Sequence, residues 1–460
     1  MGKLIWVLLC LIKLTLSEET YQNSSHICEK CTCLDNDSFL LDCSNQNIQH
    51  ALANWPPHNK SLVATFSYNN IITLERLPFT NRTAKLIFDH CNIQYLDVGV
   101  FSNIKYVEYI DLSYNLLTTE QISGEDFKGP YDNKQYREIA VKHLNLAYNQ
   151  IHSLPQKFFE SMPYLEELNL EGNDFKVLDP LTQVALGSLQ HIKVLNLANN
   201  ELTELESSIM RNLHTLIELD LSSNELDFVP TTLNYISKNL KVLKLNDNYI
   251  FKLDGQSFLG LNLTEIHLNN LPRLKLIEAN TFATQKSLKR LYVSNNLNLR
   301  AIDKEAFADN QILDELDLSN NSLTSIDFGL NWSKLKVLRI DSNMLECTCA
   351  LYNITKALSE SITRTLESPV CFYDVEDTIQ RVDHLEEGIC SGKPPVHITK
   401  IMKHFNTIRL AFILVSSVLI TSMGVLVAIA VLRYKKRVTL RNYPFMAQVN
   451  YYPIINTQHI

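Results

Sequence analysis

The stretch IELDLSSNELDFVP, residues 217–230, carries a pattern, L-x-L-x-x-N-x-L, that returns along the whole chain. In it Leu219 and Leu221 alternate with polar residues, which is the two-residue period of a strand that buries one face. A single short strand cannot bury its leucines alone, so successive copies must stack into a parallel sheet over a common core. The amide of Asn224 has two donor hydrogens and an acceptor oxygen, enough to satisfy backbone groups of adjacent turns inside that core.

Aligned by this asparagine, the pattern occurs twelve times. The aligned positions are Asn69, Cys91, Asn115, Asn149, Asn173, Asn200, Asn224, Asn248, Leu271, Asn296, Asn321 and Asn343. A period of about 20–29 residues is typical of leucine-rich repeats. The chain resembles extracellular leucine-rich-repeat receptors and adhesion proteins, such as the ectodomains of the Toll-like, Slit and chaoptin-type families. The resemblance implies an α/β repeat fold, a curved horseshoe solenoid with its parallel sheet on the concave face.

Three positions depart from the pattern. Cys91 replaces the asparagine, as the family pattern allows, and we expect it to be a buried free thiol. Leu271 interrupts the asparagine series, and the register of its repeat is open by a residue or two. An insertion, ISGEDFKGPYDNKQYREIA at residues 122–140, contains Gly, Pro, Asp and Asn and predicts a loop that bulges from the solenoid. That loop is either functional or a tolerated surface insertion.

Phenylalanines recur on the returning segments of the repeats, where we expect them to fill the core. They are Phe101, Phe159, Phe258, Phe282 and Phe307.

Cysteines cluster at both ends of the repeat array. Cys28, Cys31, Cys33 and Cys43 precede the first repeat, and Cys347, Cys349, Cys371 and Cys390 follow the last. An open solenoid exposes its core at each end, so we interpret these segments as disulfide-bonded caps rather than zinc or thiol-redox sites. The spacing leaves three pairings open for each cap. The resemblance to known caps implies Cys28–Cys33, Cys31–Cys43, Cys347–Cys371 and Cys349–Cys390.

Two apolar segments predict a single-pass type I membrane protein. Residues 1–17 have a basic residue, an apolar run and small residues, as in a secretory signal peptide; an uncleaved anchor is the alternative. Residues 410–432 are 23 uncharged residues, long enough to cross a bilayer as a helix. RYKKR follows directly, which places the tail at residues 433–460 in the cytoplasm. We therefore expect the ectodomain at the outer face of the plasma membrane.

These signals divide the chain into seven segments. We assign residues 1–17 to the signal peptide, 18–60 to the N-terminal cap, 61–346 to about twelve repeats, 347–390 to the C-terminal cap, 391–409 to a linker, 410–432 to the transmembrane helix and 433–460 to the tail.

Eight N-x-S/T sequons agree with this topology, because all precede the apolar segment. They are Asn23, Asn36, Asn59, Asn81, Asn262, Asn320, Asn331 and Asn353.

Charge and motifs exclude several function classes. The formal net charge is −8, and the excess of acid lies in the predicted ectodomain, which argues against a nucleic-acid partner. No nucleophile elbow, zinc-binding HExxH, phosphate loop or dinucleotide fingerprint occurs. We therefore expect no enzyme activity, no cofactor and no metal site. The tail is too short for a kinase or Toll/interleukin-receptor domain, so any signal requires a partner protein.

We expect the binding surface on the concave face of the sheet, where alternate side chains of each strand are free to contact a partner. The residue before the aligned position is aromatic in four successive repeats: Tyr68, His90, Tyr114 and Tyr148. A strip of rings suits protein contact, although these residues also recur in such repeats without a ligand. Farther along, Lys289 and Arg290 lie close to Tyr292, and Lys336 and Arg339 follow in a later repeat. The acidic residues Asp314, Glu315 and Asp317 lie between these basic pairs and dilute any polyanion site.

The tail contains two Tyr-x-x-bulky motifs, Tyr443 to Met446 and Tyr452 to Ile455. Each resembles the sorting signal that clathrin adaptors bind as an extended peptide. The alternative is a tail whose tyrosines have no role.

The function we infer is a receptor or co-receptor without its own signalling domain that binds a protein ligand. The alternatives are a cell-adhesion molecule and an accessory innate-immune recognition protein.

Overall fold

The computed structural model describes residues 27–391, apart from residues 51, 208–210, 237–238, 309, 359–361, 363–368 and 374–377. The predicted signal peptide, Asn23, the transmembrane segment and the tail with Tyr443, Met446, Tyr452 and Ile455 lie outside the described residues, as does nearly all of the linker. Between residues 27 and 391, no helix combines the length and apolar character needed to cross a bilayer.

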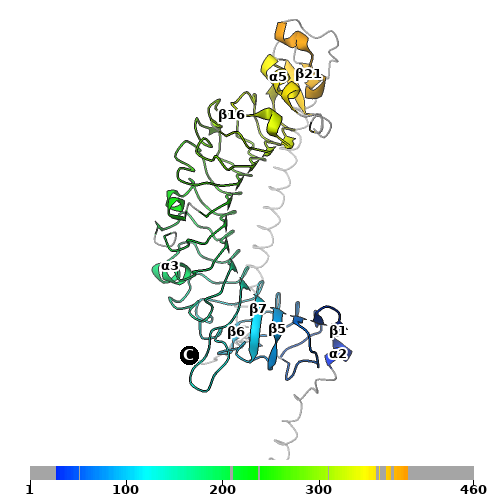
Figure 1. Ribbon diagram of the computed structural model, residues 1–460, viewed down its shortest axis with the longest axis vertical. Coiled ribbons are helices and arrows are strands. Elements are labelled where there is room, and N and C mark those ends of the chain that lie inside the picture. The colour runs from blue at the N-terminus through cyan, green and yellow to red at the C-terminus, as the bar shows by residue number, and fades with distance from the viewer. Residues whose placement is uncertain are drawn as a thin grey trace, which may run out of the picture. The chain divides into compact units, whose positions relative to one another are not determined.

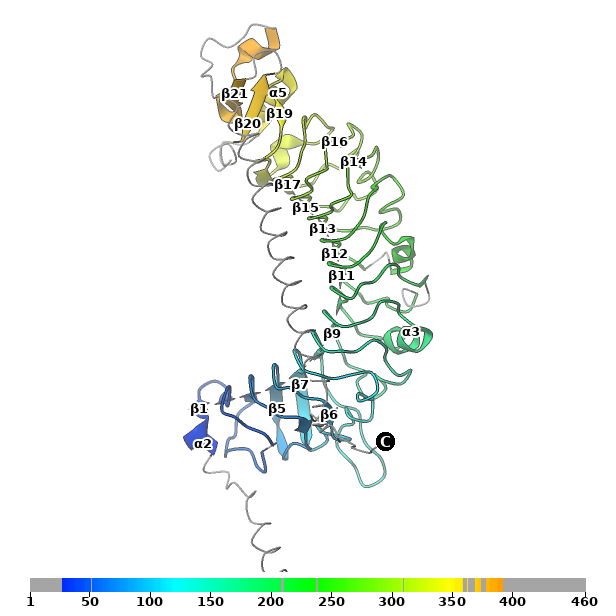
Figure 2. The same cartoon turned by 180° about the vertical axis from the view of Figure 1, so that it is seen from behind.

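A 14-stranded sheet runs through the repeats, and its strands lie side by side in the order of the chain. The numbers missing from this order belong to strands of smaller sheets. Two strands belong to the N-terminal cap, and one belongs to each of the twelve repeats. The repeat strands are β3 (Leu62–Thr65), β5 (Thr80–Ile87), β7 (Ile104–Asp111), β8 (His143–Asn145), β9 (Glu167–Asn169), β10 (Val194–Asn196), β11 (Glu218–Asp220), β12 (Val242–Lys244), β13 (Glu265–His267), β15 (Arg290–Tyr292), β17 (Glu315–Asp317) and β18 (Val337–Arg339). The repeats form an arc, and these strands line its inner side (Figures 1 and 2).

From β8 onward each repeat strand has three residues, and only its middle residue points inward between its neighbours. Leu219 of β11 pairs in parallel register with Leu195 of β10 and Leu243 of β12, and all three are fully buried. The residues on either side of Leu219 remain half-exposed on the inner face. The two-residue alternation predicted from the sequence is confirmed, and it joins the leucines of all repeats into one core.

The predicted α content is wrong for most repeats. The returning segments are mainly turns, with short strand pairs between β4 (Thr73–Leu74) and β6 (Tyr95–Leu96) and between β14 (Leu276–Ile277) and β16 (Ala301–Ile302). Helix α3 (Pro180–Gly187) and the 3-10 helices η1 (Thr231–Ile236) and η2 (Trp332–Lys334) are the exceptions among the described repeats. Repeats of about 22–25 residues leave too few residues for a helix on the return, and α3 lies in a longer one, between Asn173 and Asn200. The fold is a β-solenoid.

Each ladder asparagine connects neighbouring turns from inside the core. The Asn224 Nδ2 group donates to the carbonyl oxygens of Leu197 and Leu221, each at 3.0 Å. Its Oδ1 accepts from the backbone N–H groups of Asn200 at 3.0 Å and Leu202 at 2.9 Å. The side chain thus satisfies backbone groups where the strand ladder stops, as the sequence predicted.

The two departures from the ladder keep part of this function. Cys91 is fully buried and free, and its thiol lies 2.9 Å from the carbonyl oxygen of Phe66, the contact that an asparagine makes elsewhere. Burial raises the pKa of the Cys91 thiol to about 11. Leu271 is fully buried at the ladder position, three residues after Leu268, and its N–H donates to Asn296 Oδ1 at 2.6 Å. The register of this repeat is therefore that of its neighbours.

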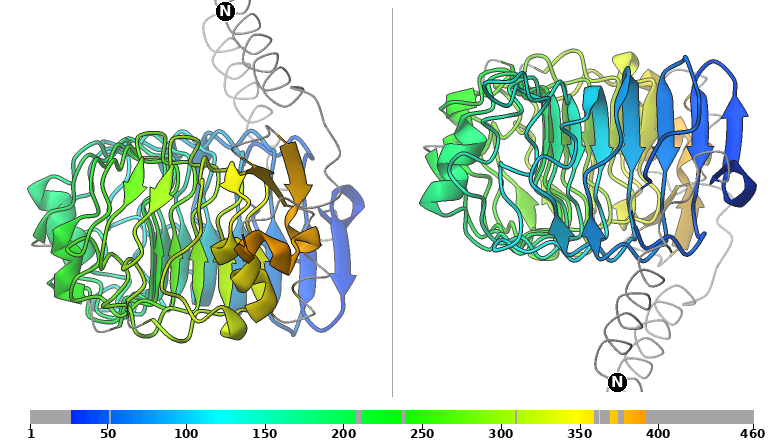
Figure 3. Two further views of the ribbon diagram at one scale, coloured as in Figure 1. Left: turned by 90° about the horizontal axis from the view of Figure 1, so that it is seen from above. Right: turned by 90° about the horizontal axis from the view of Figure 1, so that it is seen from below.

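Disulfide-bonded caps cover both ends of the described solenoid (Figure 3). The N-terminal cap comprises α2 (Ile27–Lys30), β1 (Thr32–Asp35) and β2 (Phe39–Asp42), with disulfides Cys28–Cys33 and Cys31–Cys43. The C-terminal cap comprises β19 (Leu345–Glu346), α5 (Cys349–Ala357), β20 (Val370–Tyr373), β21 (Thr378–Arg381), η3 (Val382–His384) and η4 (Glu387–Ser391). Its disulfides are Cys347–Cys371 and Cys349–Cys390. These are the pairs that the resemblance implies.

Buried phenylalanines stack on the outer side of the core. Phe258, Phe282, Phe307 and Phe328 lie in successive repeats with ring centroids 5.7, 5.0 and 4.9 Å apart. All are buried, so they fill the core and form no groove.

Candidate binding surface

Four aromatic rings form a continuous stack across the first four repeats, which we call the aromatic ladder: Tyr68, His90, Tyr114 and Tyr148. Their ring centroids are 4.5, 4.3 and 4.4 Å apart in that order, with interplanar angles of 20°, 11° and 8°. The sequence predicted that these side chains neighbour one another, and the structure places them in contact. Tyr68 is 60% exposed and Tyr114 is 45% exposed, so the stack is accessible to a partner.

The aromatic ladder lies at the edge of the sheet and not on its concave face, where we expected it. Each ring belongs to the third residue after the end of its strand, as Tyr114 follows β7 and Tyr148 follows β8. The concave face itself carries strand residues such as Asp111 and Asn145. The reason is the backbone conformation: a turn with positive φ follows each strand and directs this residue away from the sheet face.

Positive φ at this position makes the rings unusual. The backbone φ angles are 59° at Tyr68, 53° at His90, 54° at Tyr114 and 53° at Tyr148. This left-handed region costs an L-residue with a side chain about 1–2 kcal/mol, and glycine and asparagine tolerate it best. The equivalent residues in the later repeats are small or polar: Gly172, Asn199, Ser223, Asp247, Asn270, Asn295, Asn320 and Ser342. Aromatic residues therefore occupy four turns against the local backbone preference.

Stacking offsets part of this cost, and a glycine marks the end of the stack. Each stacked aromatic pair contributes about 0.5–1.5 kcal/mol beyond its burial. A Cβ placed on Gly172 would lie 2.5 Å from the ring of Tyr148, and Gly172 has a φ of 65°. A side chain at this position would therefore displace the ring. The sequence did not predict a role for Gly172 in this site. Its position directly before Asn173, the aligned asparagine of the fifth repeat, is the signal that could have indicated it.

Hydrogen bonds hold both the middle and the end of the aromatic ladder. The His90 ring Nδ1 lies 2.8 Å from Asp89 Oδ2, and the Ser67 hydroxyl donates to the same carboxylate. The Tyr148 hydroxyl donates to Glu171 Oε1 at 2.8 Å. This bond to a carboxylate raises the pKa of Tyr148 to about 12. The rings are therefore fixed in place before any partner arrives.

The charges of the concave face are paired with one another from strand to strand. Lys244 lies 2.6 Å from Glu218 and 3.5 Å from Asp220, and Arg339 lies 3.5 Å from Asp317. Further pairs are Arg290 with Glu265 and Lys336 with Asp314. Three of the four basic residues noted near the C-terminal repeats, Arg290, Lys336 and Arg339, are therefore paired with acids.

The insertion forms a hairpin rather than an irregular loop. Gly129 N donates to Arg137 O at 2.9 Å, and Arg137 N donates to Pro130 O at 2.8 Å. Tyr131 and Tyr136 face each other with ring centroids 5.2 Å apart, and Tyr131 is 57% exposed. A Cβ on Gly129 would meet the Glu138 carbonyl oxygen at 2.5 Å, so only glycine permits this close approach. The hairpin projects from the outer side of the arc (Figure 1).

The sequence did not predict a pair of exposed phenylalanines, one of which lines a groove. Phe228 and Phe251 lie 4.5 Å apart, edge to face, and are 54% and 44% exposed. Phe228 is part of the wall of a groove of about 530 Å³, which Glu204 and Lys252 also line. Phe228 stands four residues after Asn224 and Phe251 three residues after Asn248, so no single repeat position marked the pair in the sequence.

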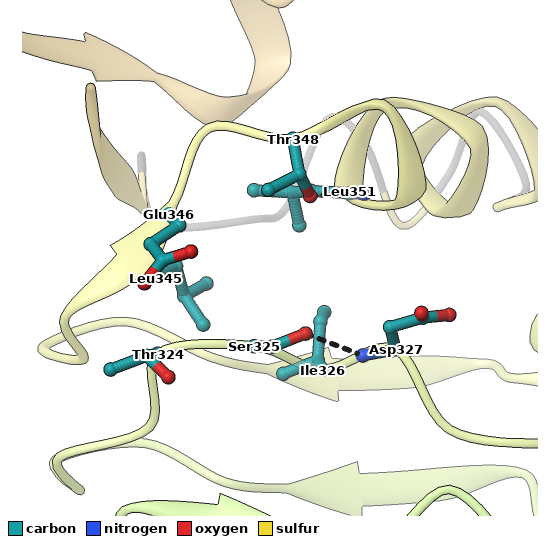
Figure 4. Close-up of a pocket in the computed structure, with 8 residues that line it drawn as sticks. All are labelled: Thr324, Ser325, Ile326, Asp327, Leu345, Glu346, Thr348 and Leu351. Atoms are coloured by element: carbon teal, nitrogen blue, oxygen red, sulfur yellow. Dashed lines mark hydrogen bonds between the residues drawn. The ribbon is translucent and has the colours of Figure 1, made fainter. Parts of the chain in front are cut away.

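The joint between the last repeat and the C-terminal cap offers no ligand site. Figure 4 shows Thr348 and Leu351 facing Ser325 and Asp327 across a crevice whose accessible volume for a water molecule is about 0 Å³. Asp327 N donates to Ser325 Oγ at 3.1 Å. The crevice is a packing contact. Across the described residues, no group of three or more His, Cys, Asp or Glu side chains is arranged to hold a metal ion.

Four of the seven described sequons lie at the edge of the sheet where the strands begin. Asn59 and Asn262 each lie three residues before a strand, Asn81 is the second residue of β5, and Asn331 precedes β18 by six residues. Asn36 and Asn353 lie in the caps, and Asn320 lies in a turn at the other edge. Asn331 is half-buried, and the other six are exposed. The edge that carries the aromatic ladder has no sequon in its four repeats.

Comparisons with known proteins agree with this architecture. The family described as "Leucine rich repeat" matches residues 139–194 and 286–345. Over 290 residues, the chain is 26% identical to "Transforming growth factor beta activator LRRC33" of Danio rerio, covering 53% of this chain and 41% of that protein. It is 32% identical to "Tsukushi-A" of Xenopus laevis, covering 36% of this chain and 51% of that protein. It is 29% identical to "Toll-like receptor 3" of Boselaphus tragocamelus, covering 56% of this chain and 28% of that protein.

The chain therefore spans less than two thirds of the length of these three relatives. A solved structure, a leucine-rich-repeat protein of Leptospira interrogans, superposes with a TM-score of 0.49 and 25% sequence identity, covering 65% of this chain and 76% of its own.

Proposed function

Because the chain belongs to the extracellular leucine-rich-repeat proteins with disulfide-bonded caps, we propose that it is a cell-surface recognition protein. Its ectodomain binds a protein partner, and residues 410–432 anchor it as a single-pass type I protein with a cytoplasmic tail. It acts as a receptor or co-receptor for that partner, a role supported by the similarity to receptor proteins.

The aromatic ladder is the observation that carries this proposal. Tyrosine offers a large contact area at a low entropic cost, and it is enriched at the centres of protein interfaces. Here three tyrosines and a histidine occupy backbone positions that favour small residues, which the structural role of the turn alone does not require. The rings are already fixed by stacking and by the Tyr148–Glu171 hydrogen bond, so binding a partner would cost little further ordering.

The positions of the sequons also favour a partner that binds at the edge of the sheet carrying the aromatic ladder. Glycans at Asn59 and Asn81 would occupy the edge where the strands begin, and the aromatic ladder lies where the strands end. A partner that approaches Tyr68 to Tyr148 would not meet a glycan in those repeats. The class of partner is suggested by relatives: LRRC33 is named as an activator of transforming growth factor beta, and we propose a protein ligand for this chain as well.

The binding proposal can be tested on living cells by proximity labelling with the full-length chain. We expect the double variant Tyr114→Ser with Tyr148→Ser to lose labelled surface proteins that the wild type retains, at equal surface amount. Tyr95→Ser with Tyr164→Ser is the matched control, because both tyrosines are exposed and lie outside the aromatic ladder. An identical set of labelled proteins for the ladder variant and the wild type would contradict the proposal.

Topology is tested in the same cells. An epitope tag placed after residue 17 should be accessible to antibody on intact cells, and a tag at the C-terminus should become accessible only after permeabilisation. The opposite accessibility would exclude the type I orientation.

Two other functions fit the same architecture. An accessory role in innate immunity is favoured by the similarity to Toll-like receptor 3, and enrichment of microbial rather than host ligands on the wild-type surface would support it. Adhesion would instead appear as aggregation of otherwise non-adhesive cells that express the chain.

The tail motifs give a further proposal for trafficking, with a clathrin adaptor as the cytoplasmic partner. Proline follows Tyr443 and Tyr452, which biases each tyrosine towards the extended conformation that adaptor pockets accept. Tyr443→Ala with Tyr452→Ala should slow antibody uptake and enlarge the surface pool. Met446→Ala with Ile455→Ala should reproduce the effect, and unchanged uptake rates in both variants would refute the motif.

A further inference from the structure

Phe79 is an exposed aromatic side chain on a fixed backbone. Its exposed fraction of 71% is the highest among the large apolar side chains of the described residues. Its neighbours Pro78 and Thr80 are buried. The Pro78 carbonyl accepts from Trp55 Nε1 at 2.9 Å, and Thr80 N donates to Asn103 O at 3.2 Å. The backbone on both sides of Phe79 is therefore held in place, while the ring itself is exposed to solvent.

A β-bulge lies in β5, directly after Phe79 and Thr80 in the chain. Thr80 pairs with Ile104 and Thr83 with Tyr106, so β5 has one more residue than β7 between these two pairs. The bulge contains Asn81, and Arg82 N donates to Thr80 Oγ1 at 3.2 Å. Bulges redirect side chains and interrupt the alternation of a strand. As a result Asn81, Arg82 and Thr83 are exposed in succession.

Phe79 and Asn81 lie directly before and after the buried Thr80, and both are exposed to solvent. Asn81, Arg82 and Thr83 form a sequon whose amide and hydroxyl are both exposed. We propose that Asn81 carries an N-glycan and that its first sugar packs against the ring of Phe79. The proposal is independent of the partner-binding function.

The modification joins Asn81 Nδ2 to C1 of the first sugar. The glycan comes from a lipid-linked diphosphate oligosaccharide: its C1–O bond to the diphosphate breaks, the lipid diphosphate leaves with the bonding electron pair, and the amide nitrogen loses one proton. The Asn81 side chain keeps its carbonyl oxygen and becomes a secondary amide. No oxidant or metal-bound intermediate is needed for this transfer.

The contact has a physical basis in the two surfaces involved. One face of a pyranose ring presents C–H groups and little hydrogen-bonding capacity, and an aromatic ring presents a flat face with negative potential that such C–H groups approach favourably. Placing the sugar over Phe79 removes apolar surface from water without leaving a polar group unpaired. The glycan would thus cover the most exposed apolar side chain of the described chain.

No other sequon in the described chain has an aromatic residue two positions before its asparagine. Leu34, which is 44% exposed, stands two residues before Asn36, and Pro57 stands two residues before Asn59. Two residues before Asn262 stands Gly260, and two residues before Asn331 stands Gly329. Before Asn320 and Asn353, the corresponding residues Leu318 and Leu351 are buried. Asn262 is therefore a natural internal control, with an exposed sequon and no side chain to support its first sugar.

The test is a double-mutant cycle on the full-length chain, produced in a eukaryotic secretory host. The variants are Phe79→Ala, Asn81→Gln and the combination of both, and the readouts are the occupancy of Asn81 by glycopeptide mass spectrometry and the thermal midpoint. We expect Phe79→Ala to lower the midpoint by about 1–2 °C when Asn81 is glycosylated. In the Asn81→Gln background, the same substitution should leave the midpoint unchanged.

Three controls test whether the effect comes from contact between the Phe79 ring and the first sugar on Asn81. Phe79→Tyr should retain the wild-type midpoint because it keeps the flat ring. Enzymatic trimming to the first sugar should preserve the effect of Phe79→Ala, and Asn262→Gln should not change it. An unoccupied Asn81 would overturn the proposal, and so would an effect of Phe79→Ala that is equal with and without the glycan, including no effect in either. Loss of labelled partner proteins with Phe79→Ala, without coupling to Asn81, would reassign the ring to a partner surface.

Discussion

At the scale of single residues, the solenoid depends on two adjacent positions in each repeat. The ladder residue turns inward and bonds backbone groups, and the residue before it takes a positive φ, between 53° at His90 and 65° at Gly172. The left-handed turn allows the chain to leave the sheet and also projects a side chain at the sheet edge. Fold and candidate binding surface therefore share one backbone feature.

Asn224→Leu should lower the free energy of unfolding by about 1–3 kcal/mol, because backbone groups of Leu197 and Asn200 lose their partner. The measurement is the urea midpoint of the purified chain. Asn234→Leu makes the same chemical change at an exposed position of η1 and should have little effect. Equal losses in the two variants would show that burial of the amide is not what matters.

Gly172→Ala should destabilise the chain by about 2 kcal/mol, because alanine at positive φ is strained and its Cβ meets the Tyr148 ring. In a Tyr148→Ala background the ring is gone, and only the backbone strain should remain. The urea midpoints of the four proteins give the coupling between the two positions. If the cost of Gly172→Ala is the same in both backgrounds, the stack does not end on this glycine.

At the scale of elements, the insertion after Asn115 contains a buried carboxylate. Asp126 is 4% exposed; its Oδ2 accepts from Ser123 N at 2.7 Å and its Oδ1 from Ser123 Oγ at 3.0 Å. Its own carbonyl oxygen accepts from Val100 N at 3.1 Å. Burial raises the pKa of Asp126 to about 6, and the hydrogen bonds from Ser123 oppose this shift.

This shift predicts a dependence of stability on pH. A carboxyl group whose folded pKa is raised stabilises the fold fully below its unfolded pKa of about 3.8, and that contribution is lost as the pH rises through about 6. Asp126→Asn keeps the hydrogen-bonding shape without the charge. We expect the variant to gain about 3 kcal/mol over wild type at pH 7.4, with the difference disappearing towards pH 4. Thermal midpoints of both proteins across this pH range provide the measurement, and parallel curves would contradict the assignment.

At the scale of the whole described chain, a solenoid without its caps would expose the core of its terminal repeats. In the C-terminal cap, the Cys349–Cys390 disulfide closes a segment of 41 residues over the last strands. Leu338 and Ile340 of the last repeat are buried, and they would lose protection if the cap opened.

Cys349→Ala with Cys390→Ala should therefore cost about 2–5 kcal/mol and reduce the amount of chain that reaches the cell surface. Limited proteolysis of the remaining protein should cut first around residues 335–346. Cys91→Ser is the control, since it removes a cysteine that forms no disulfide. Normal surface display and unchanged proteolysis of the double variant would mean that the cap is dispensable.

Periodicity alone determined the repeat number, the inward leucines and the ladder asparagines, because these depend on local alternation and on burial, which each repeat states in its own sequence. The disulfide pairing came from the resemblance, since four cysteines leave several pairings open. Only the tertiary structure decided that Tyr68 to Tyr148 stand at the edge of the sheet, that Gly172 ends their stack, and that Phe79 is exposed beside a bulge. These features depend on the sign of φ and on contacts between residues 22 or more positions apart, which a one-dimensional pattern does not specify. The same reason explains the groove at Phe228 and the absence of helices on most returning segments: both follow from how neighbouring turns pack, and not from the composition of any one turn.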